Sequence, residues 1–159
     1  MATFAPGVIA ARVVPSMVCS RSLSFTSWQE CEGQMRIAGL DHLVLTVRNI
    51  EVTAAFYERV LGMERAMFGE GRVCLTFADQ KINLHQSGRE FAPRALVPTP
   101  GSGDLCFVIE TPLVDAMAHV QACGVEITEG PVPRAGARGP FTSFYCRDPD
   151  GNLLEISAY

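Results

Sequence analysis

Residues 147–159 read RDPDGNLLEISAY, and this stretch decides the fold. Asp148-Pro149-Asp150-Gly151 predicts a tight turn, because proline presets one backbone angle, glycine accepts a left-handed one and aspartate can bond nearby amides. An apolar strand follows with one carboxylate, Glu155, inside it. An acid in a buried strand is costly unless something offsets its charge. We therefore expect Glu155 either to face solvent or to meet a cation.

Length and composition indicate which class of protein this is. A chain of 159 residues predicts one domain, and 48% hydrophobic with 19% charged residues is typical of a globular protein with a buried core. The net charge of −4 and the lack of a Lys/Arg run argue against a nucleic-acid surface. No apolar stretch reaches the roughly eighteen residues of a membrane span. We expect neither nucleic acid nor a membrane as partner.

Residues 1–36 differ from the rest of the chain. They hold no acidic residue before Glu30, and serine recurs through them. Two interpretations stay open: a mitochondrial transit peptide, or an overextended start ahead of a domain that begins near Met35. We expect a poorly ordered extension in either case. The protein is then cytoplasmic, or mitochondrial if the transit peptide is genuine.

The cysteines form no C-x-x-C pair, so neither a zinc ribbon nor a redox motif is present. They are Cys19, Cys31, Cys74, Cys106, Cys123 and Cys146. Buried free thiols in a reducing compartment are the better interpretation.

A strand–helix pattern begins with LDHLVLTV at 40–47, which predicts a strand. Asn49 is a plausible helix N-cap, and Gly62 a natural residue to end that helix. Three apolar residues recur on one helix face: Val52, Phe56 and Val60. Three short strands are expected next, at 63–68, 72–77 and 81–85.

After a proline-rich connector at 87–101 the pattern restarts. GDLCFVIE at 103–110 predicts a strand, Thr111 caps a helix, and Gly124 ends it. Its apolar face consists of Leu113, Met117 and Val120. Further strands are expected at 125–128, 141–146 and 152–158.

Both halves therefore have the order βαβββ, in modules at about 37–86 and 102–159. A duplication of this size predicts an α+β fold over residues 37–159. We expect the two modules to form a curved, cup-shaped mixed sheet with the helices outside.

Two stretches carry a family resemblance: DHLVLTVRNIEVTAAFYERVLGM at 41–63 and RDPDGNLLEI at 147–156. On these residues the chain resembles the vicinal oxygen chelate superfamily, which includes glyoxalase I, bleomycin-resistance proteins and extradiol dioxygenases. Within it, residues 68–95 and 129–140 are most similar to the glyoxalase domain-containing proteins. The end motif is specific for the fold and much less so for activity.

The resemblance implies a divalent metal in the cup of the sheet. The ligand position of the first strand falls on His42, that of the final strand on Glu155, and that of the second module's first strand on Asp104, where His is commoner. Asn83 stands where glyoxalase I has a Glu. His85 lies on the same face, about 7 Å along the strand. His85 is a ligand if the register is wrong by two. If the register is right, it is a group beside the ligands or near the substrate.

From the residues alone, His42 and Glu155 are each more often structural than ligands. Their corresponding places in repeated modules favour a shared cavity. One His with two carboxylates suits Mn, Fe, Ni, Co or Zn. His119, near the end of the second helix, is expected to be exposed.

The segment 130–140 holds three glycines and three prolines around Arg134 and Arg138. We expect an ordinary edge loop. The alternative is a mobile flap over the cup, with an arginine for an anionic substrate.

Three functions stay open. The first is a metal-dependent enzyme of lyase, isomerase or dioxygenase type on a small oxygenated substrate, in which Glu155 acts as base if it is displaced from the metal. Glyoxalase I and catechol-cleavage activities are expected to be weak. The second is a metal-free binding protein whose cup is lined by aromatic residues: Phe77, Phe107, Phe141, Phe144 and Tyr145. The third is a protein-binding module that uses an open sheet edge. The resemblance also implies that a homodimer can form.

Overall fold

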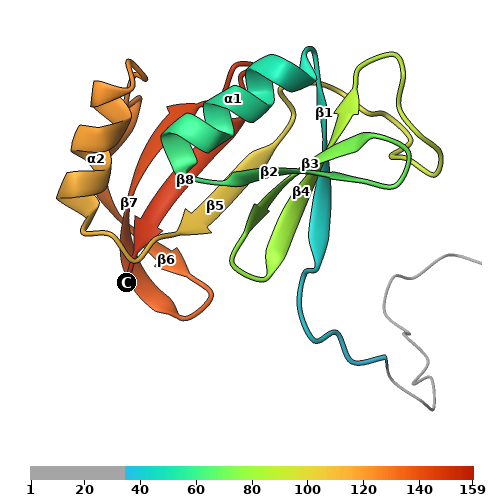
Figure 1. Ribbon diagram of the computed structural model, residues 1–159. Coiled ribbons are helices and arrows are strands. Elements are labelled where there is room, and N and C mark those ends of the chain that lie inside the picture. The colour runs from blue at the N-terminus through green and yellow to red at the C-terminus, as the bar shows by residue number, and fades with distance from the viewer. Residues whose placement is uncertain (1–34) are drawn as a thin grey trace, which may run out of the picture. The chain divides into compact units, whose positions relative to one another are not determined.

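Two copies of one strand–helix–strand–strand–strand order follow each other along the chain (Figure 1). The structure is a computed structural model that describes residues 35–159, of which Ala38–Tyr159 form one compact unit. The first module consists of β1 (His42–Val47), α1 (Ile50–Leu61), β2 (Glu64–Phe68), β3 (Arg72–Phe77) and β4 (Gln80–Gln86). The second consists of β5 (Asp104–Val108), α2 (Leu113–Ala122), β6 (Glu129–Gly136), β7 (Gly139–Arg147) and β8 (Leu153–Ala158). The predicted βαβββ repeat is confirmed. The predictions for the extension, including Cys19 and Cys31, fall on residues 1–34 and lie outside the described part.

Each module forms its own four-stranded mixed sheet. The strand order is β1-β4-β3-β2 in the first and β5-β8-β7-β6 in the second. The first strand of each module runs parallel to its last, and the remaining pairs are antiparallel. The predicted curved mixed sheet thus consists of two four-stranded sheets, each hydrogen-bonded within itself. The helices pack against the apolar faces of these sheets.

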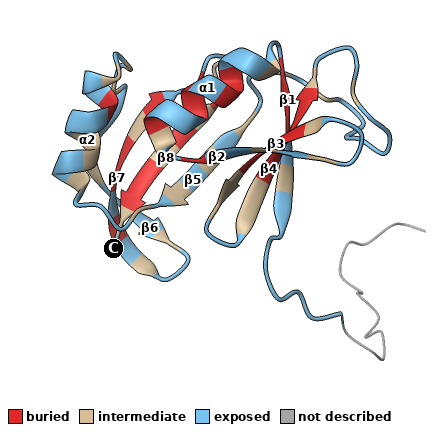
Figure 2. Cartoon of the chain, in the orientation of Figure 1, coloured by how far each residue is buried: buried red, intermediate tan, exposed pale blue. Residues whose placement is uncertain are grey.

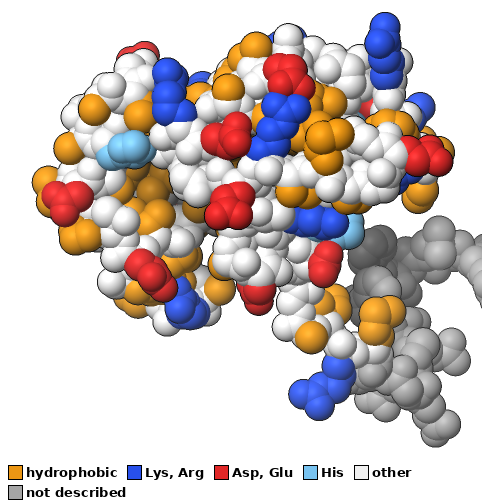
Figure 3. Space-filling model, viewed as in Figure 1, with side chains coloured by type: hydrophobic (Ala, Val, Ile, Leu, Met, Phe, Trp, Pro, Cys, Tyr) orange, Lys and Arg blue, Asp and Glu red, His pale blue; other side chains and the backbone are white. Residues whose placement is uncertain are grey.

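One hydrophobic core joins the two modules. Its most buried large side chains come from both: Tyr57, Leu75, Ile82, Leu84, Phe144 and Leu154. Buried residues lie along the central strands and one side of α1, whereas α2 is mostly exposed (Figure 2). Acidic and basic side chains are interspersed on the face shown in Figure 3. Neither α1 nor α2 has the length and apolar character of a membrane-spanning helix.

Helix α1 begins and ends where the sequence predicts. Asn49 Oδ1 accepts hydrogen bonds from two first-turn amides at 2.9 and 3.2 Å, and Gly62 follows with φ 65°. Phe56 and Val60 are buried as expected, but Val52 is 52% exposed. The buried face is rotated instead towards the Asp148–Asn152 turn, and its further members are Thr53, Ala54 and Tyr57.

Helix α2 differs more from its prediction. Pro112 rather than Thr111 occupies the N-cap position, and no side chain caps the helix. Val120 is buried, while Leu113 and Met117 pack only partly against the core. This helix is therefore more loosely held than α1.

Strand β6 corrects two predictions. Most of the segment 130–140, expected as an edge loop or flap, instead forms β6 and the start of β7, which pair as a hairpin. Residues 125–128 are not a strand. Pro131 and Pro133 are tolerated because β6 is the edge strand of its sheet, where one side needs no partner. The glycines and prolines therefore mark an edge hairpin, with a register shift between Glu129 and Val132.

The four described cysteines are free thiols. Cys74 and Cys146 are buried as expected, Cys123 is half-buried and Cys106 is exposed. Burial raises the pKa of Cys146 to about 11, so that thiol is protonated at neutral pH.

Candidate metal and substrate site

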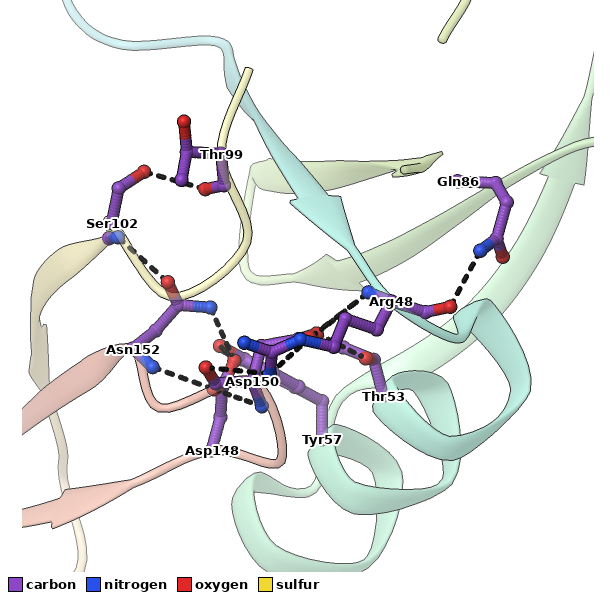
Figure 4. A network of polar contacts seen from close by, with 10 residues as sticks. Arg48, Thr53, Tyr57, Gln86, Thr99, Ser102, Asp148, Asp150 and Asn152 are labelled. Carbon is purple, nitrogen blue, oxygen red and sulfur yellow. Dashed lines mark hydrogen bonds and ion pairs between the residues drawn. The ribbon is translucent and has the colours of Figure 1, made fainter. Parts of the chain in front are cut away.

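The Asp148–Asn152 turn fixes the start of β8 (Figure 4). The buried Asp148 carboxylate accepts hydrogen bonds from the amides of Asp150 and Asn152 at 2.9 Å each. Its other oxygen accepts from Asn152 Nδ2 at 2.7 Å and from the Tyr57 hydroxyl at 3.1 Å. Burial, followed by the charge of Asp148, raises the pKa of Tyr57 far above its usual range, so Tyr57 stays a donor.

Asp150 ties this turn to the first module. The Arg48 backbone amide donates to both Asp150 carboxylate oxygens at 3.0 and 3.3 Å, and the Arg48 guanidinium lies 3.3 Å from the same side chain. Because Arg48 directly follows β1, the end of β1 and the start of β8 share one anchor. This anchor sets the two modules, and hence their candidate ligands, in a fixed relation.

Glu155 is half-buried on β8, on the face opposite the core, since both of its chain neighbours are core residues. Ser143 Oγ donates to Glu155 Oε1 at 2.6 Å. Ser157 Oγ lies 3.0 Å from Ser143 Oγ, and Cys106 Sγ lies 3.2 Å from Ser157 Oγ. A row of polar side chains thus crosses β7, β8 and β5 and ends at the carboxylate.

The Cys106 thiol at the end of this row is not a ready nucleophile. Partial burial of the sulfur raises the pKa of Cys106, the hydrogen bond with Ser157 opposes that rise, and the Glu155 carboxylate adds to it. A protonated thiol is weakly nucleophilic and a poor metal ligand.

A hollow of about 470 Å³ lies on this face of the second sheet, with Asp104 and Glu155 among its lining. Arg134 and Tyr145 also line it: Arg134 Nε donates to the Tyr145 hydroxyl at 2.9 Å, and Arg134 Nη2 to Glu129 Oε1 at 2.6 Å. Burial raises the pKa of Tyr145, the bond from Arg134 lowers it, and Glu155 raises it. Arg134 is therefore held by its neighbours on a strand rather than carried on a flap.

Arg138 lies in the turn between β6 and β7. Its guanidinium stacks 4.1 Å from the centroid of the Tyr159 ring. Neither arginine of this segment is thus placed as a mobile anion clamp.

In the first module, His42, Asn83 and His85 share one sheet face. His42 is partly exposed, and its Nδ1 hydrogen-bonds to Asp41 Oδ1 at 2.6 Å. Asn83 Oδ1 is buried and has no hydrogen-bond partner among residues 35–159. His85 is buried beside the ring of Phe91, with ring centroids 5.6 Å apart.

The two modules place their candidates at matching register positions. His42 pairs with Lys81, two residues before Asn83 on β4. Asp104 pairs with Leu153, two residues before Glu155 on β8. Since side chains two apart share a strand face, His42–Asn83 and Asp104–Glu155 form equivalent diagonal pairs. Asn83 thus occupies the register position in the first module that Glu155 occupies in the second.

Within residues 35–159 no group of three or more His, Cys, Asp or Glu side chains is placed to hold one metal ion. The first-module pair and the second-module pair therefore do not come together as one such group in the described part of a single chain. Whether His42, His85, Asp104 and Glu155 bind a metal stays a prediction.

The match to a known family agrees with this architecture. The model for the Glyoxalase/Bleomycin resistance protein/Dioxygenase superfamily matches residues 39–156. The chain belongs to this superfamily. A glyoxalase-superfamily fold accounts for the duplicated βαβββ module. The finer likeness to glyoxalase domain-containing protein 5 stays a prediction.

Three relatives are similar to this glyoxalase-superfamily chain over most of its length. Glyoxalase domain-containing protein RDO1 of Mycosarcoma maydis is 50% identical over 147 residues, covering 92% of this chain and 83% of that protein. Virulence protein STM3117 of Salmonella typhimurium is 54% identical over 126 residues, covering 79% and 88%. The structure of the integron cassette protein VCH_CASS1 of V. cholerae is 60% identical with a TM-score of 0.78, covering 79% of this chain and 98% of that one.

More distant structures share the fold alone. Lactoylglutathione lyase from Agrobacterium tumefaciens is 22% identical with a TM-score of 0.61, covering 77% of this chain and 95% of that one. TnmS3, an antibiotic binding protein from Streptomyces sp. CB03234, is 20% identical with a TM-score of 0.62, covering 79% and 98%. One glyoxalase-superfamily fold thus occurs both in an enzyme and in a binding protein.

Sequence reasoning missed the serines around Glu155. Ser143 and Ser157 are both 0% exposed, yet they lie on the polar face. Ser157 could have been found from its position in the strand, because it follows Glu155 by two residues in β8 and so lies on the same face. Ser143 could be found only from the β7–β8 register, which pairs it with Ser157.

Proposed function

We propose that the chain is a divalent-metal-dependent enzyme, of lyase, isomerase or dioxygenase type, that acts on a small oxygenated substrate. The observation that carries this proposal is the matched register of two diagonal pairs, His42–Asn83 and Asp104–Glu155. Two repeated modules that each present a potential ligand pair at the same positions suit a site formed where the two pairs meet.

The residues fit a divalent cation chemically. The Asn83 Oδ1 atom is buried without a donor, a state that costs about 1–3 kcal/mol unless a partner meets it. A cation would satisfy this oxygen. An imidazole, an amide oxygen and two carboxylates suit Fe, Mn, Ni, Co or Zn.

The full donor set points to a homodimer. Because the described residues of one chain hold no group of three candidate ligands, the proposal brings the first module of one copy against the second module of its partner. A twofold pair of this kind creates two identical sites from one interface.

The chain's own residues have separate roles around a bound cation. A cation bound here would supply Lewis-acid stabilisation of negative charge on a substrate oxygen. Asp41 holds His42 Nδ1, which leaves Nε2 as the ligand atom. Ser143 holds Glu155 Oε1 and thereby orients the carboxylate, and Glu155 accepts a substrate proton at Oε2. His85, two residues beyond Asn83, serves as a ligand or as a group near the substrate.

Two reactions are expected to be weak. Isomerisation of the hemithioacetal of methylglyoxal and glutathione needs a second strong base, and Asn83 is neutral where glyoxalase I has a Glu. Ring cleavage of a catechol usually needs a His at the position of Asp104. Rapid turnover of either substrate by the purified protein would contradict this expectation.

Elemental analysis of the purified protein tests the proposal. We expect stoichiometric divalent metal in the wild type and its loss in both His42→Ala and Glu155→Ala. The exposed residues His119 and Glu126 supply matched controls, His119→Ala and Glu126→Ala, which should retain the metal. Mixing His42→Ala with Glu155→Ala chains should restore part of the metal, because a mixed dimer has one intact site. A metal-free wild type would sink the proposal.

A metal-free binding protein is the second candidate. It is favoured by the neutral Asn83 and by the shared fold of TnmS3, whose name describes antibiotic binding. The expected aromatic lining does not support it. Tyr145 borders the hollow, but Phe144 is fully buried in the core, and Phe77 and Phe107 pack against that core in edge contact at 5.6 Å. A wild type without metal that binds a flat ligand would establish this function instead.

A further inference from the structure

A second hollow lies at the carboxyl ends of β1 and β4, and neither His42, Asp104 nor Glu155 lines it. It encloses about 480 Å³, and it shares no lining residue with the hollow that contains Asp104 and Glu155. In Figure 1 the start of α1 and the segment that leaves β4 meet at this end of the first sheet. Gln86 Nε2 donates to the Arg48 carbonyl at 2.6 Å and ties these two segments together.

The hollow is lined by an excess of positive charge. Three arginines line it, Arg48, Arg72 and Arg89, against one acid, Glu51. Glu51 is already neutralised by Arg65, which donates to both carboxylate oxygens at 2.6 Å.

One of these arginines, Arg48, is paired with Asp150. The other two, Arg72 and Arg89, are not paired with an acid of the described residues. Among the described residues, no Asp or Glu oxygen lies within 4.0 Å of the guanidinium of Arg72 or Arg89. The chain as a whole carries a net charge of −4, so the positive lining of this hollow is a local exception.

An aromatic ring orients one of the free guanidinium groups. The Arg72 guanidinium carbon lies 4.6 Å from the centroid of Phe91. Phe91 is 40% exposed, and with the apolar residues Val73 and Leu84 it adds an apolar part to the lining. A cation is attracted to the face of an aromatic ring, so this contact helps to position the guanidinium beside the hollow.

We propose that this hollow binds a phosphate monoester whose ester group is apolar. Two unpaired guanidinium groups match the charge of a phosphate dianion, and a carboxylate would neutralise only one of them. The Phe91 ring and the neighbouring apolar lining accept the ester group. The first turn of α1 adds a small favourable field, although Asn49 already caps its amides. The site shares no lining residue with the hollow that contains Asp104 and Glu155, although His85 lies beside its Phe91 ring.

Phenyl phosphate is the probe, measured by calorimetric titration of the full-length protein. We expect saturable binding of one equivalent, weakened about ten-fold or more by Arg72→Gln and by Arg89→Gln, since each removes charge-assisted hydrogen bonds. Arg94→Gln is the matched control. Arg94 lies in the same connector as Arg89, and its substitution makes the same charge change, but Arg94 does not line the hollow. Phe91→Ala should weaken phenyl phosphate more than inorganic phosphate.

Several outcomes would overturn the proposal. These are no saturable binding, equal losses in Arg94→Gln and the two lining variants, or benzoate binding as tightly as phenyl phosphate. Arg89 is exposed, so Arg89→Gln gives a result even if Arg72→Gln disturbs folding. Binding that persists in His42→Ala and Glu155→Ala places the ligand outside the metal site, so this proposal and the proposed enzyme fail separately.

Discussion

The Tyr57 hydroxyl donates to the Asp148 carboxylate at 3.1 Å across the boundary between the two modules. Tyr57 lies on α1 and is 0% exposed, while Asp148 begins the turn that leads into β8. One hydrogen bond thus couples a first-module helix to the strand that carries Glu155. Together with the Arg48–Asp150 contacts, this bond helps to set the position of the candidate base.

Tyr57→Phe should lower the free energy of unfolding by about 1–3 kcal/mol, because a buried carboxylate loses a donor while the ring still fills its space. Urea unfolding followed by circular dichroism measures the change. Tyr159→Phe is the matched control: Tyr159 is 51% exposed, and its change should stay within about 0.5 kcal/mol. Equal effects of the two substitutions would contradict the role of the Tyr57–Asp148 bond.

Asn152→Asp should destabilise the protein by about 3 kcal/mol or more. Asn152 is 1% exposed and donates from Nδ2 to Asp148 at 2.7 Å, so an aspartate would place two carboxylates in contact. Asn49→Asp makes the same chemical change at a helix N-cap, where both residues cap well, and should change stability by less than about 0.5 kcal/mol. Urea titrations of both variants at neutral pH decide the matter, and a stable Asn152→Asp protein would refute the network.

Much of this anchor was predictable from sequence because its chemistry is local. The turn at Asp148–Gly151, the Asn49 cap and the alternation that places Glu155 opposite the core all follow from short-range rules. The contacts of Asp148 with Tyr57 and of Asp150 with Arg48 were not predictable, because they join residues about a hundred positions apart.

Other features were not predicted from the sequence, because tertiary pairing overrides local composition. Residues 129–136 have the glycines and prolines of a loop, yet an edge position lets them form β6. Likewise, Val52 fits the apolar period of α1, but the helix turns Thr53 and Tyr57 inward to meet buried aspartates. The matched diagonal pairs could be recognised only from the strand register. From the sequence, that register could be inferred only by aligning the strands of the two modules.

Gly130→Ala should cost more than about 3 kcal/mol, because a methyl group there would lie 2.6 Å from Phe144 Cα in a backbone conformation of φ 120°. Gly124→Ala supplies the control: its φ is also positive, 74°, but no atom lies within 4 Å of the added methyl. Its cost should be about 1–2 kcal/mol, from the backbone alone. Thermal and urea unfolding of both variants separate the two effects. A similar cost for both would show that β6 does not approach β7 as closely as described.

His85 should make the stability depend on pH. Burial lowers its pKa, the positive charge of Arg72 lowers it further, and Glu90 partly opposes both. The unfolded chain has a His pKa near 6.5, so between this value and the lower folded value the unfolded state binds more protons. The contribution of His85 is therefore fully present above about pH 6.5 and is lost as pH falls through the folded pKa.

An NMR titration of the His85 imidazole tests this directly, because the midpoint should lie below that of an unfolded histidine. Arg72→Gln should raise the midpoint, since it removes a positive charge, and Glu90→Gln should lower it, since it removes a negative one. Urea titrations of wild type and His85→Asn at pH 7, 6 and 5 give the matching stability difference, with the wild type losing more stability as pH falls. A midpoint above 6.5, or shifts of the reverse sign in the two charge variants, would show that His85 is not held in this buried, Arg72-facing position.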